Sequence, residues 1–142
     1  MKFKIATALV AVTLAGSAVA QEAGDAAAGE NLFGKRCRSC HMIVDDAGAT
    51  IVKGGRTGPN LYGVIGREAA SVEDYRYKKS IEEAGEKGLV WDEASFEAYV
   101  QDPTGFLRDY LDDKGARSGM TFKLREGAPD VYAYLASLTG EK

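Results

Sequence analysis

The chain has 142 residues, of which 45% are hydrophobic and 27% charged, with a formal net charge of −3 at pH 7. This length supports one domain with one modest core. The excess of acidic residues argues against a nucleic-acid-binding protein, because phosphates require a net basic face.

The first 20 residues are predicted to be a secretory signal peptide. Two lysines precede an uncharged run at residues 5–20, and this run ends in the small residues Ala18-Val19-Ala20. The run is short for a bilayer span, and nothing after it resembles a stop-transfer segment, which disfavours a membrane anchor. We therefore expect cleavage after Ala20, a single exported domain at residues 21–142, and no anchor after cleavage.

The exported part predicts short helices separated by long polar loops, with little strand pattern. Asp25 is a good N-cap for a first helix at residues 25–36. A weaker helix is predicted at residues 77–84, where Gly85 would stop it.

Three more helices are predicted in the second half of the chain. Asp92 caps the first of them, which ends before Pro103. Helical spacing of apolar residues at 106–111 predicts the next, which ends by Gly115. The last opens at Pro129 and runs to about residue 138. The expected fold is therefore all-α, with about five short helices.

Residues 45–70 form a glycine-rich stretch with little periodicity. Loops of this length in a small domain are uncommon unless something organises them. A buried prosthetic group would do so, because loop side chains could pack on it.

The most informative motif is Cys37-Arg38-Ser39-Cys40-His41, the C-x-x-C-H attachment signature of c-type haem. Two thiols at this spacing can form thioethers with the two vinyl groups of a porphyrin. The imidazole of the next residue then becomes the proximal iron ligand. The protein has two cysteines and one histidine, and all three fall in this motif.

Three alternatives to haem attachment fit the motif less well. A thioredoxin-like redox pair expects a βαβ context that this sequence lacks. A zinc site needs about four ligands, and two cysteines and one histidine fall short. A disulfide between Cys37 and Cys40 would leave His41 unexplained.

A closed electron carrier needs a second axial iron ligand, and the chain has no second histidine. After cleavage the remaining methionines are Met42 and Met120. Met42 follows His41 directly and cannot reach the opposite face of the ring. Met120 lies in a glycine-containing loop and is the predicted ligand, with core filling as the alternative use of a methionine.

Further segments carry a family resemblance. Gly24-Asp25 with Gly29 and Phe33, and the stretch 56–63 (Arg-Thr-Gly-Pro-Asn-Leu-Tyr-Gly), resemble those of the class I cytochromes c, and most closely the bacterial cytochromes c2. The resemblance implies the cytochrome c fold around one covalently bound haem c. It also implies a close crossing of the first and last helices at Gly29. Residues 45–53 and 111–118 look like the insertions of the larger bacterial type.

The resemblance also assigns roles in the haem pocket. The carbonyl of Pro59 would accept a hydrogen bond from the His41 imidazole. Tyr99 would lie behind the axial methionine. The residues that would hydrogen-bond the haem propionates are Arg67, Tyr77 and Trp91. For Trp91 and Tyr99, simple core packing is the alternative role.

With both axial positions filled, the implied function is outer-sphere electron transfer by a periplasmic, monomeric protein that is not an enzyme. The implied partners are membrane-bound redox complexes: a bc-type complex, and a photosynthetic reaction centre or cytochrome oxidase. We expect a ring of basic residues around the haem edge to steer docking. Its members are Lys35, Arg36, Arg38, Arg117, Lys123 and Arg125. A haem enzyme or gas sensor with open iron is the runner-up, and a disulfide-containing interaction module is the third hypothesis.

Overall fold

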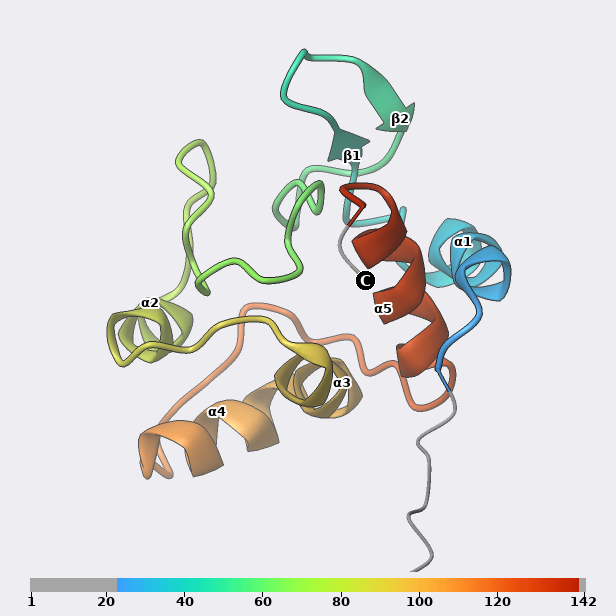
Figure 1. Ribbon diagram of the computed structural model, residues 1–142. Coiled ribbons are helices and arrows are strands. Elements are labelled where there is room, and N and C mark those ends of the chain that lie inside the picture. Colours follow the sequence, from blue (N-terminus) through green and yellow to red (C-terminus); the bar gives the residue numbers. More distant parts are fainter. Residues whose placement is uncertain (1–22, 141–142) are drawn as a thin grey trace, which may run out of the picture.

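The computed structural model describes residues 23–140, so the expected signal peptide lies outside the described residues. Within this range five short helices and one small antiparallel hairpin are connected by long loops (Figure 1). In chain order these elements are α1 (Ala26–Arg36), β1 (Ile43–Val44), β2 (Thr50–Val52), α2 (Lys79–Glu86), α3 (Glu93–Gln101), α4 (Pro103–Leu111) and α5 (Ala128–Ser137). None of the helices in residues 23–140 is long and apolar enough to cross a membrane.

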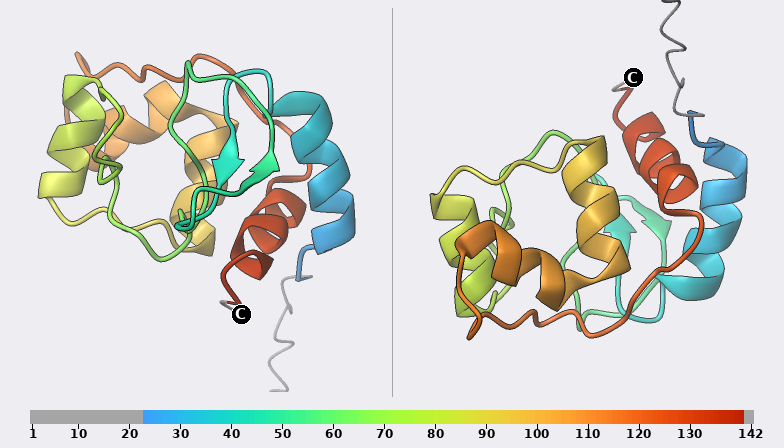
Figure 2. Two further views of the ribbon diagram at one scale, coloured as in Figure 1. Left: turned by 90° about the horizontal axis from the view of Figure 1, so that it is seen from above. Right: turned by 90° about the horizontal axis from the view of Figure 1, so that it is seen from below.

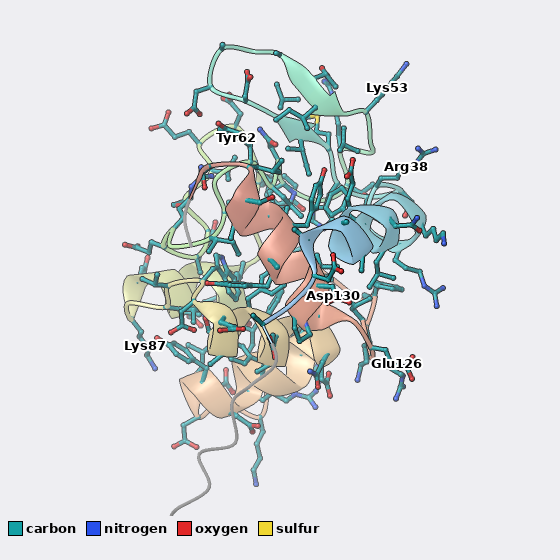
Figure 3. All side chains as sticks on the ribbon, turned by 45° about the vertical axis from the view of Figure 1, so that its right-hand side comes forward. Arg38, Lys53, Tyr62, Lys87, Glu126 and Asp130 are labelled. Atoms are coloured by element: carbon teal, nitrogen blue, oxygen red, sulfur yellow. The ribbon has the colours of Figure 1, made fainter. Side chains whose placement is uncertain are left out.

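Helix α1 begins after Asp25 and packs against α5 (Figures 1 and 2). The Asp25 carboxylate caps α1 by accepting from the backbone N–H groups of Ala27 and Ala28. Asp130 of α5 accepts from the Asp25 N–H at 2.8 Å and lies where the two helices meet (Figure 3). A Cβ at Gly29 would overlap the Asp130 carbonyl, so only glycine allows this approach. The expected crossing at Gly29 is confirmed.

The predicted stop at Gly85 is wrong, because α2 continues through this residue to Glu86. Gly85 is buried against Ala69, and a Cβ there would overlap the Ala69 carbonyl. The glycine therefore serves packing. The chain leaves the helix at Gly88, whose φ of +91° is in the left-handed region that favours glycine.

Helices α3 and α4 meet at a tight corner. Asp92 and Ser95 form a capping box at the start of α3, as the N-cap prediction expected. Asp102 ends α3 and caps α4 through the Gly105 N–H. Pro103 is the first residue of α4, so this helix begins earlier than its apolar spacing indicated.

A short hairpin follows the haem-attachment motif, with β2 and the turn inside residues 45–53 and β1 just before them. Ile43 pairs with Val52 and Val44 with Thr50. The side-chain amide of Asn60 binds both the N–H and the carbonyl of Val44, at 3.0 and 2.8 Å. Strands of two and three residues are too short to give an alternating pattern, which explains why the sequence did not predict them.

The apolar interior consists of two clusters of buried side chains. One is built mainly by α1, α3 and α5 and includes Phe33, Val131 and Leu135. The other lies between α2 and α4 and includes Trp91 and Leu107. Figure 2 shows the corresponding helix groups, α1 with α5 and α2 with α4, in different parts of the molecule.

Candidate functional site

A cavity of about 410 Å³ takes its walls from both clusters. Apolar side chains from every helix but α4 line it, among them Phe33, Ile81, Phe96, Val100 and Leu135. The structure brings all the predicted site residues to this one cavity. They are Cys37, Cys40, His41, Pro59, Arg67, Tyr77, Trp91, Tyr99 and Met120.

The attachment motif forms a turn directly after α1. The Cys37 N–H donates to the Phe33 carbonyl, and the His41 N–H donates to the Cys37 carbonyl. The Gly58 N–H donates to the Cys40 carbonyl at 2.8 Å. The motif is thereby fixed both to the helix before it and to the loop that faces His41.

The histidine of the motif is oriented by Pro59. Its Nδ1 donates to the Pro59 carbonyl at 2.9 Å, which leaves Nε2 with a lone pair for a metal. Burial lowers the pKa of His41, although the Pro59 carbonyl opposes this by binding the protonated nitrogen. A Cβ at Gly58 would overlap the imidazole ring, so the ring fills the space that this glycine leaves. The expected His41–Pro59 hydrogen bond is present.

The two cysteines are not joined in a disulfide. Burial, with the nearby Cys40 thiol as a smaller cause, raises the pKa of Cys37 to about 11. A thiol with this pKa is protonated at neutral pH, unlike the nucleophilic cysteine of a thioredoxin-like pair. Residues 23–140 also hold no group of three or more His, Cys, Asp or Glu side chains that could bind a metal.

Met120 lines the cavity, whereas Met42 is absent from its wall. The Met120 N–H donates to the Ser118 hydroxyl at 3.0 Å. The Tyr99 hydroxyl, from α3, shares a hydrogen bond of 2.9 Å with the same Ser118 oxygen. Tyr99 thus reaches the loop of Met120 through Ser118.

The residues expected at the propionates also line this cavity. Arg67 donates to the Tyr62 carbonyl at 3.0 Å, and the Tyr77 hydroxyl accepts from the Val72 N–H at 3.4 Å. Trp91 is buried and packs on Tyr99, with ring centroids 4.9 Å apart. Its side chain also lines the cavity.

These features fit a covalently held, largely apolar ring. An apolar group bound in this cavity would cover the apolar side chains that line it, and burial of apolar surface is favourable. Two thiols, one oriented imidazole and one thioether around the same cavity supply the donor set of a c-type haem.

Comparison with known proteins supports the same assignment. No protein-family model matches the chain. It is 56% identical to a cytochrome c-551 of Roseobacter denitrificans over 132 residues, which cover 93% of each chain. It is 50% identical to a cytochrome c2 of Rhodobacter capsulatus over 139 residues, covering 97% of this chain and 98% of the relative.

Solved structures agree with the sequence relatives. The structure of cytochrome c2 from Rhodobacter capsulatus matches with a TM-score of 0.79 and 52% identity, over 82% of this chain and 99% of that one. The structure of cytochrome c2 from Paracoccus denitrificans matches with a TM-score of 0.79 and 50% identity, over 82% and 98%. The chain belongs to the cytochrome c2 family.

Membership of the cytochrome c2 family confirms the predicted all-α cytochrome c fold. It also confirms that the protein is an electron carrier and not an enzyme, and that it carries one covalently bound haem c.

Sequence analysis missed three residues that organise this cytochrome c2 site. Ser118 binds the Met120 N–H two residues on, a local turn that serine favours and that could have been inferred from its position. Tyr75 donates to the Thr57 carbonyl at 2.7 Å, and no local pattern signals this contact. Thr104 accepts from the Ser118 N–H at 3.2 Å, a contact across 14 residues that depends on the tertiary fold.

Proposed function

We propose that this cytochrome transfers single electrons between membrane-bound redox complexes in the periplasm, with His41 and Met120 as axial ligands of its haem iron. The observation that carries the proposal is the common cavity wall of Cys37, Cys40, His41 and Met120. When bound, haem supplies a one-electron couple between ferric and ferrous iron.

The protein's own residues hold both ligands in place. Pro59 fixes the His41 ring and its tautomer, and Gly58 leaves space for that ring. Ser118 fixes the main chain at Met120. Ligands that do not rearrange favour rapid electron transfer, and apolar walls that exclude water keep the pocket polarity low.

Docking is proposed to use the basic ring. Its six members, Lys35, Arg36, Arg38, Arg117, Lys123 and Arg125, are all exposed. Arg36 also lines the cavity, and Arg38 points outward beyond the end of α1 (Figure 3). Lys123 pairs with Asp102 at 2.8 Å, which reduces its free charge. Acidic surfaces on a bc-type complex, and on a reaction centre or cytochrome oxidase, would attract the other cations.

Export and oligomeric state complete the proposal. Residues 1–20 would be removed as a signal peptide, and the mature cytochrome would act as a monomer in the periplasm. Neither Cys37 nor Cys40 is in a disulfide, so both thiols can form thioethers with haem. Sequencing the N-terminus of the mature protein would test this part, with Gln21 expected as the first residue.

The ligand assignment is tested by optical spectra of the oxidised and reduced holoprotein. Ferric iron bonded to methionine sulfur gives a weak far-red band, which should be present in the wild type and abolished in Met120→Ala. Met42→Ala is the matched control and should keep the band, because Met42 does not line the cavity. Haem without the band would indicate open iron and refute the closed carrier. Protein without covalent haem would refute the cofactor assignment at Cys37 and Cys40.

A further inference from the structure

The loop that carries Met120 is tied to the corner between α3 and α4 on both sides of the methionine. Before Met120, the Ser118 N–H donates to the Thr104 hydroxyl at 3.2 Å. After Met120, Lys123 pairs with Asp102 at 2.8 Å. Thr104 and Asp102 lie within three consecutive residues of the corner, so one short segment contacts the loop on both sides of Met120.

This corner is well fixed in the fold. Pro103 is fully buried at the first position of α4, and the Asp102 carboxylate accepts from the Gly105 N–H. One turn on, Leu107 is completely buried in the cluster beneath α4. Thr104 therefore lies at a helix start that buried packing and a side-chain cap hold in place.

Ser118 connects this corner to the methionine. Its N–H is bound by Thr104, and its hydroxyl binds the Met120 N–H at 3.0 Å. Tyr99 contacts the same hydroxyl from α3. A displacement of Ser118 away from α4 would thus move the main chain of Met120 as well.

We propose that Thr104 is a positioning residue for Met120: its hydroxyl holds Ser118, and through it the axial ligand, against α4. This inference rests on the proposed ligation by Met120. The loop is also held to α3 by the Tyr99 contact with Ser118 and by the Leu124 N–H, which donates to the Val100 carbonyl at 2.8 Å. Of the two contacts with the corner, the Thr104 bond is the stronger determinant, because Thr104 and Ser118 are both half-buried. Lys123 and Asp102 are exposed, and salt screens such a pair.

The experiment titrates the ferric holoprotein with imidazole, which competes with methionine for iron, and follows the far-red band. Thr104→Val removes the hydroxyl at nearly constant volume, and Thr104→Ser restores it. Loss of one hydrogen bond that closes the loop should make imidazole bind about threefold to tenfold more tightly in Thr104→Val. Thr104→Ser should keep the wild-type affinity. Ser137→Ala, which removes a side chain–backbone hydrogen bond in α5, is the control and should also keep it.

Two results would overturn the assignment to Thr104: wild-type imidazole affinity in Thr104→Val, or equal gains in the Val and Ser variants. If Thr104→Val fails to fold, amide hydrogen exchange of the wild-type holoprotein tests whether Thr104 holds Ser118. A Ser118 N–H held by Thr104 should exchange slowly, and exchange as fast as at an exposed amide would refute the contact. A wild type without the far-red band refutes methionine ligation itself, and with it this inference, whereas the other outcomes leave that ligation intact.

Discussion

The contact between α1 and α5 leaves no room for a side chain at Gly29, and this makes Gly29→Ala a sharp test of the packing. A new Cβ would overlap the carbonyl oxygen of Asp130 and approach the Cβ of Tyr134 to 2.9 Å. A backbone carbonyl cannot rotate away as a flexible side chain can, so the helices must separate. That separation would strain the Asp25–Asp130 hydrogen bond and the ring contact between Phe33 and Tyr134.

Two terms set the expected magnitude. Overpacking costs about 1–3 kcal/mol, and a backbone overlap belongs at the upper end. Alanine recovers about 1 kcal/mol relative to glycine inside a helix. The net expectation for Gly29→Ala is therefore a loss of about 2 kcal/mol in the free energy of unfolding.

Gly34 provides a control on the same helix. A Cβ at Gly34 would meet nothing within 4 Å, so Gly34→Ala should keep only the helix-propensity gain of about 1 kcal/mol. Urea unfolding of the two holoproteins, followed by far-UV circular dichroism, should separate them by about 3 kcal/mol. Equal stability of the two variants would refute the claim that close helix packing requires glycine at position 29.

Two further predictions concern charge. Hydrogen bonds from the Ser95 backbone N–H and hydroxyl lower the pKa of Asp92, so its cap stabilises the fold above the unfolded pKa of about 4 and is lost as pH falls through the folded value. Asp92→Ala should cost about 1 kcal/mol at pH 7 in urea unfolding and much less near pH 2, and an equal loss at both pH values would contradict the cap. Arg36→Glu, at the cavity wall, should slow electron transfer to a membrane-bound oxidase at low salt, and the difference should shrink above about 0.15 M. Lys87→Glu, away from that wall, is the matched control, and an equal effect of both substitutions would refute local steering.

Much of the site could be predicted because its chemistry resides in rare residues with fixed local spacing. The two cysteines and the histidine lie within five positions, and His41 needs only the following loop to supply the Pro59 carbonyl. The signals for helix starts are equally local: Asp25 and Asp92 cap their helices where a short polar side chain precedes an apolar segment.

The errors and omissions of the sequence predictions occur where tertiary contacts determine the role of a residue. Gly85 reads locally as a helix stop, but Ala69, a residue 16 positions earlier, requires a small residue at that place inside α2. Thr104 gives no sequence signal, because its role depends on how α4 is aimed at the loop of Ser118. Spacing along the chain contains neither fact.

The division of the interior explains why so few regular elements can support this fold. The two apolar clusters share Val64 and Tyr99 as partly buried neighbours, and the cavity wall takes side chains from both. Local signals specify each helix, but they do not specify the separation of the clusters. An apolar group bound covalently at Cys37 and Cys40 would bury surface of both clusters at once and hold them relative to each other. On this account the long loops need little secondary structure of their own, because their side chains pack on the group that the motif attaches.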